Sequence, residues 1–121
     1  MEDYTNEVIG CAIEVHKRLG PGLLERIYSE CLKIELLHKG ISFEFEKEIP
    51  IVYRDVILDS KYRLDFVVEN SLILELKSIE KILPVHEAQV LTYMKLCNIK
   101  YGLLLNFNVP YLKDGIKRFI N

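Results

Sequence analysis

The stretch YRLDFVVENSLILELK, residues 62–77, decides the fold. It contains two apolar segments, Tyr62 to Val68 and Leu72 to Lys77, separated by the polar residues Glu69-Asn70-Ser71. Apolar segments of this length on either side of a short polar turn are typical of a β-hairpin. If the turn contains three residues, residues whose numbers add to 140 face each other. Asp65 then lies opposite Glu75.

The second strand of this hairpin carries two charged residues within an apolar run. Because side chains alternate along a strand, Glu75 and Lys77 share one face. The same register places Arg63 opposite Lys77. A two-residue turn would direct Asp65 to the other face, so the arrangement depends on the register. The opposite, core face is expected to hold Leu64, Phe66, Val68, Leu72, Leu74 and Leu76.

Two carboxylates side by side on neighbouring strands repel, so a cation is expected between them. Asp65 and Glu75 offer the oxygen ligands that Mg²⁺ prefers, and the backbone carbonyl of Leu76 is a further candidate ligand. Lys77 would orient or deprotonate an attacking water, or stabilise the transition state. This pattern indicates a Mg²⁺ (or Mn²⁺) site for cutting phosphodiester bonds. Spacing alone fits a solvated cluster of salt bridges equally well.

The remaining pattern predicts one mixed α/β domain over residues 1–121. Apolar residues at helical spacing predict helices at about 4–19, 23–38 and 85–97, with Gly20-Pro21-Gly22 separating the first two. Alternation predicts a strand from 41 to 49, then a strand pair or one bent strand over 51–58. Residues 101–105 read as a buried strand, and 112–120 fit a short helix or an edge strand. This order predicts a mixed sheet with helices packed on it.

The composition is that of an ordinary globular protein, with 28% charged residues and a net charge of −2. That charge argues against a general nucleic-acid coat protein, although a nuclease site itself needs carboxylates. The acidic N-terminus and the absence of a long apolar run predict a cytoplasmic protein with no membrane contact. Three separated cysteines, Cys11, Cys31 and Cys97, argue against a disulfide framework. Candidate phosphate contacts are Lys61, Arg63, Lys81, Lys95, Lys113, Lys117 and Arg118.

Asp65, followed after nine residues by Glu75-Leu76-Lys77, resembles the motif of the PD-(D/E)XK nuclease superfamily. Residues 22–28, GLLERIY, resemble the G-x-x-E-x-x-Y signature of the GxxExxY protein family, which belongs to that superfamily. Leu64 departs from the pattern, because the superfamily name has proline there. Further similar segments are Val15-His16, residues 19–22, 102–107 and 115–118.

The resemblance implies a restriction-endonuclease-like αβββαβ core with the active site on the central hairpin. It implies that Glu25 reaches the metal or its waters, although an exposed helix glutamate has the same spacing. Gln89 and Tyr93 resemble a Q-x-x-x-Y motif in which Gln89 contacts Lys77 or the substrate backbone; on spacing alone, a surface glutamine and a core-edge tyrosine fit better. The cleft around the site is expected to include Tyr28, Tyr93, His86 and Arg63.

Together these observations predict a metal-dependent nuclease that acts on DNA in preference to RNA. A homodimer would supply two sites for cutting two strands. The alternative is a catalytically silent module with the nuclease fold that binds nucleic acid or a protein partner.

Overall fold

The computed structural model describes residues 3–121, which form a five-stranded sheet with helices on both sides. Helices α1 (Thr5–Leu19) and α2 (Glu25–His38) come first, followed by strands β1 (Phe43–Tyr53), β2 (Val56–Val68) and β3 (Leu72–Lys77). Helix α3 (Pro84–Cys97) leads to β4 (Tyr101–Asn106), and the 3-10 turn η1 (Leu112–Gly115) precedes β5 (Ile116–Ile120). The chain from α2 to β4 therefore has the expected αβββαβ order.

The strands lie in the order β1-β2-β3-β4-β5, so β3 is the central strand. The pairs β1–β2, β2–β3 and β4–β5 are antiparallel, whereas β3 and β4 are parallel. A parallel pair needs a long crossover connection, and α3 supplies it. The sheet is thus mixed, as predicted.

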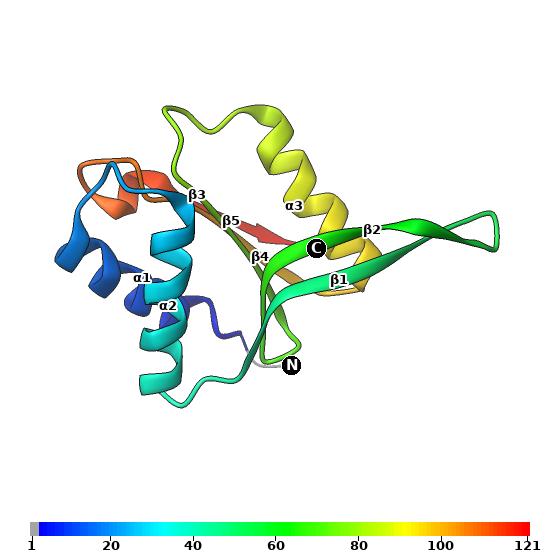
Figure 1. The fold of residues 1–121 in the computed structure, drawn as a ribbon, viewed down its shortest axis with the longest axis horizontal. Coiled ribbons are helices and arrows are strands. Elements are labelled where there is room, and N and C mark those ends of the chain that lie inside the picture. The colour runs from blue at the N-terminus through cyan, green and yellow to red at the C-terminus, as the bar shows by residue number, and fades with distance from the viewer. Residues whose placement is uncertain (1–2) are drawn as a thin grey trace.

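Helices α1 and α2 cover one face of the sheet, and α3 covers the other (Figure 1). Alternation along the central strands explains this division. On β4, Leu103 and Leu105 pack in the cluster with α1 and α2, while Leu104 packs with Val90 and Met94 of α3. On β3, the leucines at 72, 74 and 76 all face α1 and α2, so the predicted core face of this strand is confirmed.

Helix α3 packs very closely on β4 at Gly102. A Cβ atom built there would overlap the side chains of Met94 and Val90. The absence of a side chain therefore lets α3 approach the sheet, and this sets the depth of the helix over the face that carries Glu75.

The strands β1 and β2 continue beyond the sheet as a two-stranded arm (Figure 1). Residues 51–53 and 56–58 pair with each other across Arg54 and Asp55, as one of the two expectations had it, but they are the ends of β1 and β2 and not separate strands. Arg54 and Asp55 both have positive φ, 49° and 65°, as a two-residue hairpin turn requires. Pro50 is tolerated because β1 is an edge strand. The outer arm exposes Val52, Tyr53, Val56 and Ile57.

The helix ends and the C-terminal region refine the sequence predictions. Helix α2 begins at Glu25 because Leu24 before it has an extended backbone. The two alternatives for residues 112–120 are combined, with a 3-10 turn followed by an edge strand. Among the described residues, no helix has the length and apolar character needed to cross a membrane.

Candidate active site

The hairpin β2–β3 has the register that a three-residue turn predicts. Phe66 pairs with Leu74, and Val68 pairs with Leu72, so the numbers of paired residues add to 140. Glu69 and Asn70 in the turn both have positive φ, and the Ser71 N–H donates to the Val68 carbonyl at 2.9 Å. This turn geometry brings Asp65 and Glu75 to the same end of the hairpin.

The backbone ladder between β2 and β3 ends at the Phe66–Leu74 pair. Beyond it, hydrogen bonds from backbone to side chain join the two strands. The Asp65 N–H donates to Glu75 Oε1 at 3.2 Å, and the Leu76 N–H donates to Asp65 Oδ2 at 2.8 Å. Each carboxyl group thus bonds the backbone of the opposite strand. The bond to Asp65 is the shorter of the two, and together the two bonds hold both side chains in place.

Burial and charge act together on Glu75, which is only 7% exposed. Burial raises the pKa of the Glu75 carboxyl from 4.5 to about 9, with the charge of Asp65 as the second cause. Lys77 lowers this pKa, but its effect is smaller. At neutral pH Glu75 therefore holds a proton, because the effect of Lys77 is outweighed by burial and by the charge of Asp65.

Arg63 does not lie where the sequence predicted it. The β2–β3 ladder ends before Arg63, which instead pairs with Glu48 of β1. Its guanidinium contacts Glu46 Oε2 at 3.1 Å. The expected position opposite Lys77 is therefore wrong, because β2 leaves β3 and continues into the arm.

Leu64 also differs from the prediction. It is buried in the cluster with Val90 and Met94 of α3, not with Phe66 on the face of α1 and α2. The change of face coincides with Glu46 on the paired strand, whose φ of 52° lies in the left-handed region. A left-handed residue interrupts strand alternation, and a period-two pattern cannot reveal it.

Glu25, the first residue of α2, lies near the carboxylates although it is itself exposed. Lost hydration raises the pKa of Glu25, and the charge of Asp65 raises it further, whereas Lys77 lowers it. These influences place Glu25, Asp65 and Lys77 in one electrostatic cluster. The cluster thus combines residues from α2, β2 and β3.

Tyr28 fixes the turn that leads into α2. Its hydroxyl donates to the Gly20 carbonyl at 2.6 Å and accepts from the Leu23 N–H at 3.1 Å. Its buried ring stacks on Phe107 with centroids 4.5 Å apart. The Leu23 carbonyl accepts a hydrogen bond from Ser78 Oγ, just after β3, at 2.6 Å. The sequence predicted that Tyr28 would line the cleft around the site, but Tyr28 is buried. It positions the start of α2 beside β3.

The three candidate residues on helix α3 have different surroundings. Tyr93 is half-buried, and its pKa is raised by burial first and then by the charge of Glu75. His86 Nδ1 instead accepts from the Leu83 N–H at 2.9 Å, which secures the start of the helix. Gln89 is exposed, and within residues 3–121 no hydrogen bond connects it to Lys77.

Asn106 is a buried polar residue whose role the sequence reasoning missed. It lies beside Lys77 in the parallel β3–β4 pair. Its side chain accepts from the Ile79 N–H at 3.1 Å and donates to the Ile79 carbonyl at 3.0 Å. Asn106 thereby holds the chain that follows Lys77. The sequence does contain a signal for this role, because Asn106 is a polar residue at the end of the apolar run 101–105.

The donor atoms fit a small divalent cation held by few ligands. In the described part of the chain, no three His, Cys, Asp or Glu side chains are grouped closely enough to hold a metal ion. The carboxylates of Asp65 and Glu75 remain as a pair. Mg²⁺ is usually bound by one or two carboxylates, with water and substrate phosphate completing its shell. Glu25 therefore stands beside this pair as a neighbouring charge.

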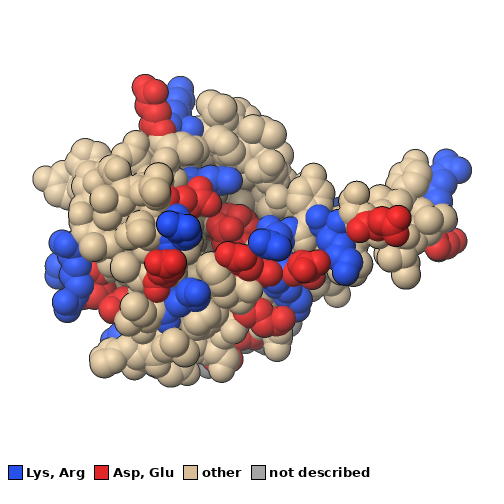
Figure 2. Space-filling view, viewed as in Figure 1, with Lys and Arg blue, Asp and Glu red and all other residues tan. Residues whose placement is uncertain are grey.

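Two of the basic residues expected at the rim of the site, Lys61 and Arg63, are paired with acidic residues. Lys61 contacts Glu48 at 3.8 Å and Arg63 contacts Glu46 at 3.1 Å, so acidic partners offset both charges on the arm. Figure 2 shows basic and acidic side chains interspersed over the face in view. The electrostatic attraction for a phosphate backbone is correspondingly limited.

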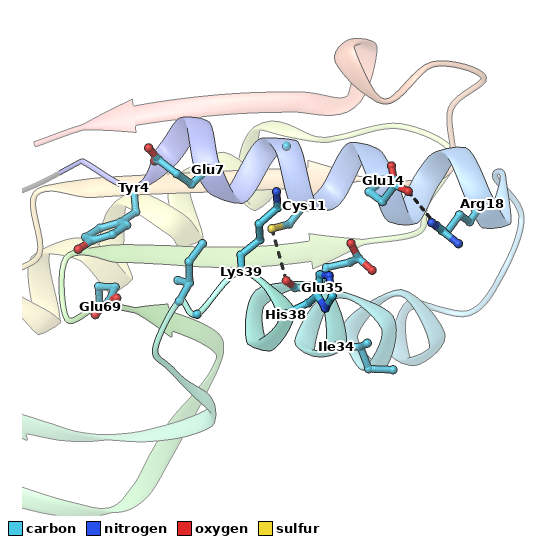
Figure 3. Close-up of a pocket in the computed structure, with 13 residues that line it drawn as sticks. Tyr4, Glu7, Cys11, Glu14, Arg18, Ile34, Glu35, His38, Lys39 and Glu69 are labelled. Carbon is cyan, nitrogen blue, oxygen red and sulfur yellow. Dashed lines mark hydrogen bonds and ion pairs between the residues drawn. The ribbon is translucent and has the colours of Figure 1, made fainter.

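A cavity of about 930 Å³ lies between α1 and α2, away from these carboxylates (Figure 3). Its lining includes four glutamates together with Arg18 and Lys39, but none of Asp65, Glu75 and Lys77. Cys11 lies at its base, where burial raises the pKa of the thiol and the Sγ contacts the Glu35 carbonyl at 3.8 Å. Among the described residues, no buried polar side-chain atom there lacks a partner. The cavity therefore contains neither the candidate catalytic residues nor a buried polar group that awaits a ligand, and we do not assign the active site to it.

Comparison with known protein families agrees with this geometry, whereas neither the curated proteins nor the solved structures yielded a match. The family described as the PD-(D/E)XK nuclease superfamily matches residues 2–119, which is nearly the whole chain. With this match and the central hairpin that carries Asp65, Glu75 and Lys77, the chain belongs to the PD-(D/E)XK nuclease superfamily.

Proposed function

We propose that the protein is a nuclease that uses Mg²⁺ or Mn²⁺ to hydrolyse phosphodiester bonds, in DNA rather than RNA. The observation that carries the proposal is the pair of Asp65 and Glu75, which bond each other's strands and share one site with Lys77. Membership of a nuclease superfamily supports the same class of reaction.

Asp65 and Glu75 would hold the metal ion, and the Leu76 carbonyl would join them. The N–H and C=O of a strand residue point to the same neighbouring strand. Because the Leu76 N–H bonds Asp65, its carbonyl also faces the β2 side and not β4. A bound divalent ion supplies an acidified water and offsets the negative charge of the phosphate.

The other residues act directly on protons and charge. Glu75 must lose its proton before it can serve as an anionic ligand, since its pKa is raised. Lys77, on the same strand face, would orient the attacking water and stabilise charge that develops on the phosphate. Glu25 would contact water at the edge of the site, and Gln89, being exposed, would contact the substrate backbone.

We also infer membership of the GxxExxY family from Gly22, Glu25 and Tyr28. The spacing has a structural purpose in this chain. Gly22 has a φ of 93°, and Tyr28 secures the turn around it by two hydrogen bonds. Glu25 lies between them at the start of α2, so the three residues together deliver a carboxylate to the site.

Hydrolysis of labelled single- and double-stranded DNA and RNA, with Mg²⁺ or Mn²⁺, tests the nuclease assignment. Asp65→Asn and Lys77→Met should each abolish cutting. The matched controls are Asp59→Asn and Lys17→Met, which change exposed charges away from the hairpin pair. Equal cutting by wild type and Asp65→Asn would point to a contaminating nuclease and remove the assignment.

A binding module without catalysis is the second candidate. It is favoured by one observation, that Glu75 is buried and its raised pKa opposes the anionic form that a metal ligand needs. Calorimetry with Mg²⁺ and Mn²⁺ at millimolar concentration, in the presence of a short oligonucleotide, separates the two. Oligonucleotide binding without metal uptake or cutting would support the module.

A further inference from the structure

Two tyrosines meet at the edge of the carboxylate cluster. Tyr62 comes from β2 at the base of the arm, and Tyr93 comes from α3. Their ring centroids are 5.6 Å apart at an interplanar angle of 53°. This tilted arrangement is a favourable one for aromatic pairs, so each ring restrains the other.

The pair lies against the site. After burial, the charge of Glu75, then Tyr62, then the charge of Asp65 raise the pKa of Tyr93. Tyr62 is three residues from Asp65 on the same strand, and the ring of Tyr93 packs against it, so the pair borders both carboxyl groups. A strand whose phosphate lay at Asp65 and Glu75 would have these rings at one side of its path.

The two rings differ in exposure. Tyr62 is 53% exposed, whereas Tyr93 is half-buried and backed by the α3 cluster. An aromatic ring that is held on one side and open on the other is a stacking surface for a flat apolar group. The contact with Tyr93 restrains the Tyr62 ring, so stacking on Tyr62 costs less side-chain entropy than stacking on a lone exposed ring.

Charge alone does not explain how a nucleic acid would be held here. The protein has a net charge of −2, and the basic residues nearest this point on the arm are paired with glutamates. Contacts that do not depend on phosphate charge are therefore needed. Base stacking on aromatic side chains is such a contact and tolerates any sequence.

We propose that Tyr62, backed by Tyr93, forms a stacking site for a nucleobase next to the phosphate that is cut. This inference rests on the proposed nuclease function and specifies its substrate. A base inside a duplex is covered on both faces by its neighbours, so only an unpaired base can stack on Tyr62. The site is accordingly specific for single strands, flaps or frayed ends.

The test is oligonucleotide binding in Mg²⁺ by the full chain carrying Lys77→Met, so that bound strands are not cut. Two fluorescent probes of equal length are compared, a single-stranded oligothymidylate and a strand of abasic sites with the same phosphates. We expect the thymidylate to bind about tenfold more tightly. Adding Tyr62→Ala should remove this preference and leave abasic binding unchanged, and Tyr62→Phe should retain it.

Tyr53→Ala is the matched control, because Tyr53 is a 65% exposed tyrosine on the outer part of the same arm. It should leave the preference intact. Equal binding of both probes by the Lys77→Met chain would overturn the proposal. So would a Tyr62→Ala change that weakens both probes equally, since that is the result expected if the pair only braces the arm against α3.

The cutting assay keeps this inference separate from the function on which it rests. If wild type cuts DNA but shows no base preference, the stacking site fails and the nuclease stands. If the base preference is present and depends on Tyr62 while no strand is cut, the stacking site stands on a binding module.

Discussion

The backbone N–H of Leu76 donates to the Asp65 carboxylate at 2.8 Å, and this bond joins the strands where their ladder has ended. Asp65 is therefore both a structural acceptor and a proposed metal ligand. Substitutions that keep or remove the acceptor separate these roles.

Asp65→Asn retains a side-chain oxygen for the Leu76 N–H but loses the negative charge. We expect hydrolysis to be lost and the free energy of unfolding to change by less than about 1 kcal/mol. Asp65→Ala should abolish hydrolysis and also cost about 1–3 kcal/mol, because it leaves the donor unpaired. Urea unfolding measures the difference. Equal destabilisation by both variants would contradict the structural role.

Glu75 should make the stability of the metal-free protein depend on pH. Its pKa rises from 4.5 in the unfolded chain to about 9 in the folded one. The folded state thus keeps a proton that the unfolded state releases, so this stabilisation is complete below pH 4.5 and is lost as pH rises toward 9. The slope is at most about 1.4 kcal/mol per pH unit.

Glu75→Gln provides the comparison for that pH effect, because an amide cannot titrate. Its unfolding free energy, measured in chelator from pH 5 to 9, should lack the decline seen in wild type. Glu48→Gln, an exposed glutamate on the arm, is the control and should follow wild type. Parallel curves for wild type and Glu75→Gln would show that Glu75 titrates normally.

Metal uptake should release a proton from Glu75. Because the metal-free carboxyl is protonated at neutral pH, the affinity for Mn²⁺ should increase from pH 6 to pH 8. Calorimetry in two buffers with different ionisation enthalpies should show a buffer-dependent heat. A heat that is independent of buffer would mean that no proton leaves on binding.

Tyr28→Phe removes only the hydroxyl that bonds Gly20 and Leu23. We expect a loss of about 1–2 kcal/mol of stability and a reduced cutting rate, because the turn before Glu25 loosens. Tyr111→Phe changes an exposed tyrosine and should alter neither quantity. Unchanged cutting in a destabilised Tyr28→Phe protein would show that Glu25 does not depend on this turn.

Glycine substitutions should report how tightly the chain packs behind the site. Gly115→Ala would force a Cβ against the backbone carbonyl of Asn106, which cannot move independently of β4. Gly102→Ala meets the flexible end of Met94, so it should be less destabilising. Gly10→Ala, in α1 with no atom nearby, should stabilise the protein by about 0.5–1 kcal/mol. Thermal unfolding tests this ranking.

The central hairpin could be predicted because its information is local. Alternation gave the two faces of β3, and the three-residue turn set the register around Asp65 and Glu75. The prediction failed where geometry departs from regular alternation. Glu46, in a left-handed conformation, interrupts the β1–β2 ladder at the level where Leu64 turns to the face of α3 and Arg63 no longer faces Lys77.

The more distant parts of the site could not be derived from spacing. The turn before Glu25 is held by Tyr28 and tied to the end of β3 through Ser78, and Glu25 feels the charge of Asp65 from there. Likewise, the contact between Tyr62 and Tyr93 depends on how the arm crosses α3. Such relationships arise from tertiary packing, which periodicity within one element does not encode.

The short distance along the chain between Asp65 and Glu75 has a kinetic consequence. A β-hairpin closes in about 1–10 μs, so these two carboxyl groups meet early in folding. Glu25 joins them only after a contact across 40 residues has formed, between Asp65 and Glu25, and Asn106 joins through its contact with Ile79 across 27 residues. The meeting of Asp65 and Glu75 is thus a local event within one hairpin. The complete site, with Glu25 and Asn106 in place, forms only when the whole domain has folded.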